Sequence, residues 1–258
     1  MTNRNQLKVF IDGQAILAHS VVRKLVENHG ISPNNILVNT YDRLDSLTFI
    51  NWMDANGIQW FKASLKDPST IQKIAEFEPD YIVSAYGLRI MPPEVLNLAK
   101  ELAFNLHSAY LPDYKGRWIP TWVILNGEEE HGITFHVMAE EIDSGDILYQ
   151  KKIPISIDET AFSLYNKLLC EFVKEFDGFF NKLLNGELTR TPMPAGGRYF
   201  GKTIPYNGII DPTWDLAFVE KFIRGMFYPP HCGAKIKIGD TYHECTTMQE
   251  YLHLHQKI

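Results

Sequence analysis

The sequence predicts an α/β protein with a mainly parallel sheet, followed by a small α+β region. Two observations lead to this prediction. Short apolar runs alternate with segments of helical spacing over the first half of the 258 residues, and a Pro- and Gly-rich stretch at 191–197 marks a change in composition. Strand, helix and strand at this pitch are typical of βαβ units on a parallel sheet. We therefore expect a larger region at 1–187 and a small carboxyl-terminal region at 188–258.

The apolar runs of the first half predict strands at 7–11, 36–38, 58–61, 81–85 and 102–105. Apolar residues at helical spacing lie between them, from Ile16 to Val26, from Leu44 to Met53 and from Ile71 to Phe77. Ligands of such sheets bind outside the carboxyl ends of the strands. The strand ends near Ala85 and Asn105 are therefore the first places to search for a site.

The second half continues with a short helix at 120–125, strands at 133–138 and 147–154, and a long amphipathic helix from Phe162 to Leu183. Asn185-Gly186 is a typical helix end. Beyond the linker, the pattern predicts a helix at 218–227 and a hairpin of strands 235–238 and 241–245 around Gly239-Asp240.

Composition limits the class of protein. The net charge of −6 and the pI of about 5.8 argue against a protein that grips nucleic-acid backbone. The three cysteines form no CxxC pair, so neither a disulfide framework nor a Cys-rich zinc site is expected. No signal-peptide core and no long uncharged apolar stretch is visible. We expect a cytoplasmic protein without a membrane partner.

The first predicted strand runs into Asp12-Gly13-Gln14, without a GxGxxG or GxxxxGK[ST] loop. A nicotinamide or ATP enzyme of the usual type is therefore not expected. His131 and His136 lie five residues apart on a predicted strand and point to opposite faces, so neither is expected to bind a ligand. No metal-ligand spacing is visible, and no metal is expected.

The most informative stretch surrounds Asn105 and His107, which lie two apart at a strand end and so share a face. An amide and an imidazole can together bind a carbonyl oxygen and move a proton. Farther on, Asp143 offers a carboxylate that can orient and charge the imidazole. Taken singly, an Asn-x-His pair is more often structural than catalytic, and an Asp before Ser-Gly is usually a turn residue.

The combination is more specific. Asn-x-His, Leu-Pro-x-Tyr-Lys-Gly, a Gly-Ile-Thr strand and Asp-x-Gly-Asp-Ile follow one another in this order, and the resulting pattern resembles the 10-formyltetrahydrofolate-dependent formyltransferase family. The resemblance is strongest over 84–155. It implies a Rossmann-like core, N-formyltransferase activity and 10-formyltetrahydrofolate as co-substrate without a metal. It also implies Asn105, His107 and Asp143 as the catalytic trio.

Two further segments resemble the folate-binding walls of that family, namely 86–93 and 139–143. The resemblance implies folate contacts from Tyr86, Leu88, Arg89, Ile90, Ala139, Glu141 and Ile142. For Leu88 and Ile90, ordinary core packing is the alternative.

The tail segments 204–212 and 222–230 resemble those of bacterial nucleotide-sugar N-formyltransferases. This implies an acceptor such as GDP-perosamine or dTDP-4-amino-4,6-dideoxyglucose, a product for O-antigen and other lipopolysaccharide, and a homodimer through the carboxyl-terminal half. The nucleobase and the position of the amine stay open. A diphosphate needs cations and a base needs aromatic surface, and the candidates are Tyr110, Lys115, Arg117, Trp118, Arg198 and Tyr199.

Two alternatives remain. One is an enzyme like methionyl-tRNA formyltransferase, although the tail is short and its charges are nearly balanced. The other is a folate-binding relative without activity, which the intact Asn105, His107 and Asp143 speak against.

Overall fold

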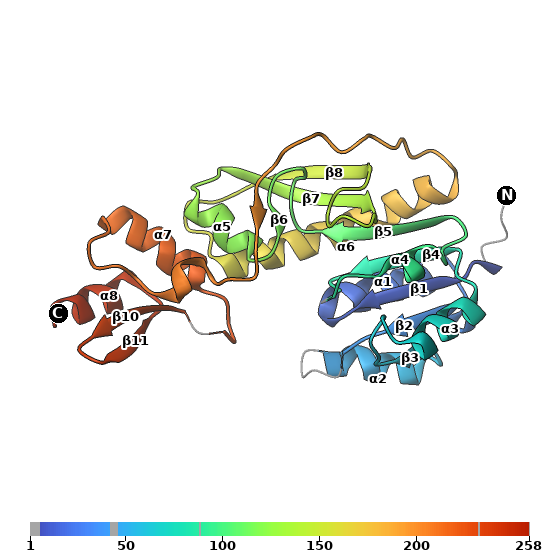
Figure 1. Cartoon of the computed structure of the whole chain (residues 1–258), viewed down its shortest axis with the longest axis horizontal. Helices are drawn as coiled ribbons and strands as arrows, with labels where there is room; N and C mark the ends of the chain where they lie inside the picture. The colour runs from blue at the N-terminus through green and yellow to red at the C-terminus, as the bar shows by residue number, and fades with distance from the viewer. Residues whose placement is uncertain (1–5, 42–45, 88, 232, 258) are drawn as a thin grey trace. The chain divides into compact units, whose positions relative to one another are not determined.

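The computed structural model describes residues 6–41, 46–87, 89–231 and 233–257. Its centre is a seven-stranded sheet in the order β3-β2-β1-β4-β5-β7-β8 (Figure 1). Strands β1 to β5 are parallel, and β7 pairs antiparallel with β5. The bounds are β1 Val9–Gly13, β2 Ile36–Asn39, β3 Gln59–Phe61, β4 Tyr81–Ala85, β5 Leu102–His107, β7 Glu130–Val137 and β8 Ile147–Pro154. The expected α/β class with a mainly parallel sheet is confirmed.

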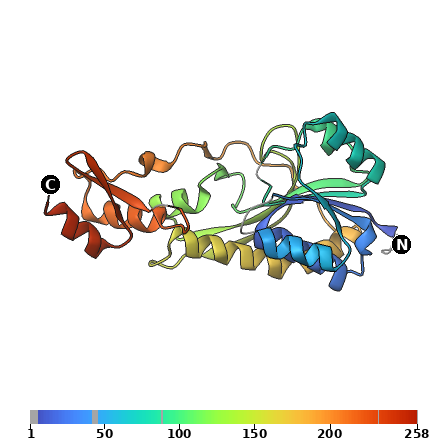
Figure 2. The ribbon, with the colours of Figure 1, turned by 90° about the horizontal axis from the view of Figure 1, so that it is seen from below.

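Helices cover both faces of this sheet, with α1 and α6 on one face and α3 and α4 on the other (Figure 2). The long amphipathic pattern forms α6, as predicted. The bounds are α1 Ala15–Glu27, α2 Leu47–Ala55, α3 Pro68–Phe77, α4 Pro93–Leu96, α5 Ile119–Leu125, α6 Ala161–Leu184, α7 Leu216–Met226 and α8 Met248–His255. Short 3-10 turns span Pro33–Asn35 and Pro205–Gly208.

Alternation along the strands separates two apolar layers. On the α3/α4 face, strand residues such as Phe10 and Ile82 pack in one cluster with Ile74 and Val95. On the opposite face, Phe104 and Phe135 contact Phe179 of α6, at ring-centre distances of 5.3 and 4.3 Å. The α3/α4 layer ends before the carboxyl ends of the strands, where polar side chains begin.

Two compact units make up the chain, and their segments are interleaved. Unit 1 contains residues 1–107, 133–150 and 169–195, and unit 2 contains residues 108–132, 151–168 and 196–258. Unit 2 includes 108–132 and 151–168 because these segments pack against the tail at 196–258. For example, the Phe162 N–H donates to Phe227 O at 3.0 Å. The proposed division at residue 188 stays a prediction.

Within unit 2, the tail forms a small module of α7, α8 and the hairpin of β10 (Ala234–Ile238) and β11 (Thr241–Cys245). Their apolar sides meet in a cluster that includes Phe222, Ile223 and Tyr251. The predicted helix and hairpin are confirmed. The sequence analysis did not predict α8, although Thr247 and Glu250 form a capping box at its start.

A second small sheet in unit 2 was also not predicted. Here β6 (Lys115–Gly116) pairs in parallel with β9 (Tyr199–Phe200), which joins two segments far apart in the chain. No helix in the described part of the chain is long and apolar enough to cross a membrane.

Candidate active site

Strand β5 presents Asn105 and His107 at its carboxyl end. Its parallel neighbour β4 pairs Ser84 with Asn105, and its antiparallel neighbour β7 pairs His136 with Asn105. Because side chains two apart on a strand point the same way, both predicted residues lie on the α3/α4 face, beyond Ala103 of the apolar layer. The imidazole of His107 is nearly buried, with 11% of the side chain exposed.

Asp143 reaches the same place from the segment after β7. Gly145 packs directly on the Val137 backbone, where a side chain would not fit, so the segment turns tightly back on the strand it leaves. Asp143 itself has a positive φ of 52° within this turn. Its Oδ1 lies 3.6 Å from His107 Nδ1. The structure therefore brings the three predicted residues together.

His136 belongs to the same cluster, which the sequence analysis did not predict. Its Nε2 lies 3.1 Å from Asn105 Nδ2 and 3.6 Å from Asp143 Oδ1. Its Nδ1 lies 2.9 Å from Val137 O, and since a carbonyl only accepts, Nδ1 carries the proton. In the neutral ring Nε2 then accepts from the Asn105 amide, which fixes the orientation of that amide. The antiparallel register of β5 and β7 supplies this contact, and nothing in the local pattern indicated it.

The arrangement combines an oriented amide, an imidazole and a carboxylate in a mostly buried setting. Chemically, a carboxylate next to an imidazole and an amide N–H next to both are groups suited to an oxygen that gains negative charge. Among the described residues there is no group of three or more His, Cys, Asp or Glu side chains suited to a metal ion. That no metal is needed stays a prediction.

Most of the predicted folate residues are exposed. Tyr86 directly follows β4 with a positive φ of 63°, and Ala139, Glu141 and Ile142 lie on the surface after β7. Ile90 is 60% exposed, so it does not pack in the core. Arg89 is also exposed, and its guanidinium carbon lies 5.5 Å from the ring centre of Tyr41. Leu88 lies outside the described residues.

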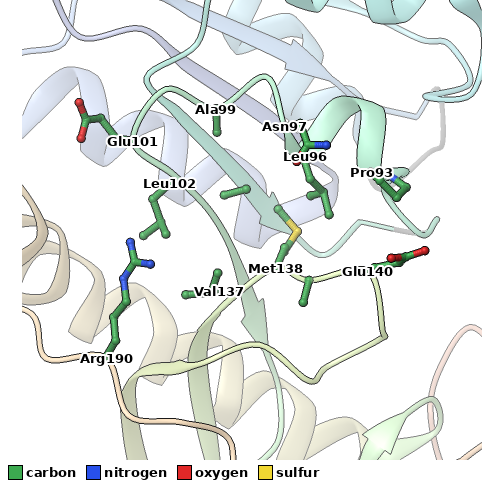
Figure 3. A pocket seen from close by; sticks show the side chains of 12 residues that line it. Pro93, Leu96, Asn97, Ala99, Glu101, Leu102, Val137, Met138, Glu140 and Arg190 are labelled. Atoms are coloured by element: carbon green, nitrogen blue, oxygen red, sulfur yellow. The ribbon is translucent and has the colours of Figure 1, made fainter.

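A cavity of about 340 Å³ opens beside these segments (Figure 3). It lies between α4, the start of β5 and the residues after β7, and Arg190 reaches toward it. Ala139 is the one predicted folate residue in its lining among those described. Its apolar wall includes Leu96, Leu102, Ala103 and Met138.

The acceptor candidates all lie in unit 2, where the pairing of β6 with β9 brings several of them together. The Arg198 guanidinium donates through Nε to both carboxylate oxygens of Asp113, at 2.9 and 3.0 Å, and through another nitrogen to Glu128 at 2.7 Å. It also stacks over Tyr114 at 4.3 Å. The hydrogen bonds from Arg198 hold the pKa of the Asp113 carboxyl below its usual range. The charge of Arg198 is thus already balanced within the protein.

The remaining candidates surround this network. Lys115 pairs with Tyr199 in the two-stranded sheet, and the Arg117 N–H donates to Phe200 O at 2.8 Å. Trp118 donates from its indole to Lys202 O at 3.0 Å. The ring of Tyr110 lies 5.4 Å from Lys152 Nζ, a neighbour that the sequence analysis did not predict. Tyr199 is 61% exposed and offers a flat aromatic surface.

Comparison with known proteins decides the family. Residues 10–174 match the model of the formyl transferase family. The chain belongs to the formyl transferase family. GDP-perosamine N-formyltransferase of Brucella melitensis is 32% identical over 239 residues, which cover 92% of this chain and 91% of that protein. The resemblance inferred from the motifs is confirmed, and the family is one of enzymes that transfer formyl groups.

Solved structures agree on the fold. An N-formyltransferase from Helicobacter canadensis, in complex with folinic acid and dTDP-3-aminofucose, has a TM-score of 0.74 at 23% identity, covering 93% of this chain and 87% of that one. A 4-N formyltransferase from Francisella tularensis has a TM-score of 0.76 at 21% identity, covering 93% and 97%. These likenesses support the α/β architecture described above.

Proposed function

We propose that this protein transfers the formyl group of 10-formyltetrahydrofolate to the amine of a nucleotide-linked amino-dideoxy sugar. The observation that carries the proposal is the meeting of Asn105, His107 and Asp143 at the carboxyl end of β5. The similarity to GDP-perosamine N-formyltransferase over 92% of the chain supports the class of acceptor.

The proposed reaction forms a bond between the amine nitrogen and the formyl carbon, and negative charge develops on the formyl oxygen. The Asn105 amide N–H and the protonated His107 donate to this oxygen. Asp143 lies beside His107 and stabilises the imidazolium. The attack is favoured in this setting because the donors are already oriented by the sheet and by His136.

Protons must also be balanced. The attacking amine must be neutral, and its nitrogen loses a proton after the new bond forms. The bond between the formyl carbon and the folate nitrogen breaks, and that nitrogen gains a proton. In this scheme the pair of His107 and Asp143 is the acid–base group, and a water held by Asp143 relays the proton.

The donor is proposed to lie between the loop 86–90 and the segment 139–142, with Tyr86, Leu88, Arg89, Ile90, Ala139, Glu141 and Ile142 as contacts. Of these residues, Ala139 also lines the cavity of about 340 Å³ between α4 and the start of β5. The acceptor is proposed to use Tyr110, Lys115, Arg117, Trp118 and Tyr199. Because Arg198 is paired with two carboxylates, Lys115 and Arg117 are the stronger choices for a diphosphate.

An acceptor panel tests the proposal. Tetrahydrofolate release is followed with 10-formyltetrahydrofolate and, in turn, GDP-perosamine, dTDP-4-amino-4,6-dideoxyglucose, a dTDP-3-amino sugar and charged initiator tRNA. We expect turnover with one of the nucleotide sugars and none with the tRNA, and the sugar that reacts identifies the product. Turnover on the tRNA alone would assign the chain to translation initiation instead.

Three finer predictions accompany the proposal. The enzyme works in the cytoplasm, its product enters O-antigen or a related surface glycan, and it forms a homodimer through the carboxyl-terminal half. Exposed apolar side chains in unit 2, Tyr206 and Leu216 among them, are consistent with the last. Sedimentation equilibrium measures the mass of the particle, and a mass near 29.7 kDa would contradict the homodimer.

A further inference from the structure

A row of polar side chains crosses the sheet just beyond its apolar layer. The strand register sets Asn39, Asp12, Ser84, Asn105 and His136 opposite one another on neighbouring strands. Paired residues point to the same face, so the whole row lies on the α3/α4 face. Asp12 is two strand spacings from Asn105, roughly 10 Å. The row therefore connects the candidate active site with the end of β1.

The end of β1 lies at the point where the strand order reverses. From β1 the chain continues to β2 and β3 on one side, and it returns to β4 on the other. Ligands of open α/β sheets bind in the crevice at such a point. The loop 86–90 starts there, because Ala85 at the end of β4 pairs with Gly13 of β1. This is the loop proposed above to hold the formyl donor.

Asp12 has an unusual environment for a carboxylate. It is 1% exposed, and Asn39 Nδ2 donates to its Oδ1 at 2.8 Å, while its Oδ2 has no hydrogen-bond partner in the described part of the chain. Burial raises the pKa of Asp12 to about 6, against the opposing effects of Asn39 and Arg89. A buried charge with so little pairing destabilises the fold at neutral pH, so a contribution to stability does not explain why a carboxylate lies at this position.

Gly87, at the start of the loop 86–90, packs directly against this carboxylate. A Cβ placed on Gly87 would lie 2.7 Å from Asp12 Oδ2 and 3.1 Å from Ser84 Oγ, so the backbone rests on Asp12. Arg89 is close enough for its charge to lower the pKa of Asp12, and it lies over the Tyr41 ring. Burial and Asp12 together raise the pKa of Tyr41 to about 12, which keeps that hydroxyl neutral. Within the described residues, Arg89 and Tyr41 are thus the titratable groups whose charge or pKa is coupled to Asp12.

We propose that Asp12 is a positioning residue for the loop 86–90. Its carboxylate attracts Arg89 and supports Gly87, and it thereby keeps the loop in the form that binds the formyl donor. The proposal rests on the proposed function for the identity of that donor. Loss of the charge loosens the loop without removing a group that touches the reacting atoms. Donor affinity falls, whereas the acceptor KM and the rate at saturating donor stay unchanged.

The first test measures the loop itself in the ligand-free protein. Asp12→Asn keeps the shape of the side chain and removes its charge. Hydrogen exchange of the peptide 84–92 is expected to become faster in this variant. The matched control is Glu27→Gln, which makes the same change in charge at an exposed ion pair with Arg23 on α1 and should exchange as wild type does. Unchanged exchange in Asp12→Asn would overturn the proposal, whatever the enzyme does with folate.

The second test measures the affinity for folinic acid by calorimetry. At pH 8, Asp12→Asn is expected to raise the Kd about twofold to fivefold, the scale of one lost charge interaction with an exposed partner. At pH 5.5 the two proteins should converge, because wild-type Asp12 is then mostly protonated. Equal affinities at pH 8, or a raised acceptor KM with unchanged donor affinity, would overturn the proposal.

A double variant checks the route through Arg89. Arg89→Gln alone should also weaken folinic acid binding, and adding Asp12→Asn should weaken it no further, because both changes break the same interaction. Strictly additive losses would assign the two residues separate roles and refute the coupling. If wild type transfers no formyl group to any amine, the proposed function fails, while loop exchange still decides the role of Asp12.

Discussion

Two aspartates, Asp12 in unit 1 and Asp113 in unit 2, have pKa values that are shifted in opposite directions. Asp12 is buried with one neutral hydrogen-bond donor, and burial raises its pKa to about 6. Asp113 lies nearer the surface and accepts from Arg198 and from two backbone N–H groups, which lower its pKa. Burial outweighs pairing at Asp12, and pairing outweighs burial at Asp113.

The polar clusters of the two units also differ in how closely their side chains are bonded. In unit 1, His136 lies 3.1 Å from Asn105 and 3.6 Å from Asp143, and Asp143 lies 3.6 Å from His107, so these two contacts of Asp143 are longer than hydrogen bonds. In unit 2, Tyr114, Glu128 and Arg198 bond one another closely. The first cluster should therefore govern rate, and the second should govern stability.

The largest effect is expected in the unit 1 cluster. His107→Ala and Asp143→Ala should each lower turnover by about 10²- to 10⁴-fold, since each removes part of the acid–base group. Steady-state kinetics give the rates, and the thermal unfolding midpoint should stay near that of wild type. His243→Ala in the tail hairpin serves as a control with normal turnover. A fully active Asp143→Ala would refute the assignment of the trio.

A smaller effect on rate is expected at His136, which acts through Asn105. His136→Ala should lower turnover roughly tenfold, about the worth of one hydrogen bond that orients the amide. KM for both substrates should change little. His136→Gln, which can again accept from the amide, should recover part of the rate. If His136→Ala loses rate and His136→Gln recovers none of it, the imidazole itself would take part in proton transfer, and the orienting role would be wrong.

Removing the charge of Asp12 should stabilise the fold, although the same change is expected to weaken donor binding. Its folded pKa lies above the unfolded value of about 3.9, so the folded state binds its proton more tightly and loses stability as pH rises from about 4 to 6. Asp12→Asn should therefore raise the free energy of unfolding by about 1–3 kcal/mol at pH 8 and leave it unchanged near pH 4. Urea denaturation at both pH values measures the difference. A variant that is less stable at pH 8 would contradict the argument.

The smallest effect is expected in the unit 2 network. Arg198→Ala should lower the free energy of unfolding by about 0.5–1 kcal/mol, because the pair is partly exposed and screened. The lowered pKa of Asp113 means that this contribution is present above the unfolded pKa and is lost as pH falls through the folded value. Turnover should be unchanged. A higher acceptor KM at unchanged stability would instead support contact between Arg198 and a diphosphate.

Regular elements were predictable because their signals are local. Apolar runs marked the strands β1 to β5, and the 3.6-residue spacing marked α6 within a residue or two of its bounds. The small sheet of β6 and β9 was not predictable, since each strand has two residues and depends on a partner more than 80 positions away. Helix α8 was predictable in principle, because Thr247 and Glu250 form a local capping box at its start.

The sequence by itself determined the family, the α/β class and the candidate trio, because motif order and strand periodicity are written along the chain. Only the tertiary structure decided what surrounds those residues. His136 meets Asn105 through strand register, Arg198 is balanced by Asp113 and Glu128, and Asp12 is buried beneath Gly87. Each of these depends on contacts between distant segments, and burial and pairing set the charge of a side chain only after such contacts form.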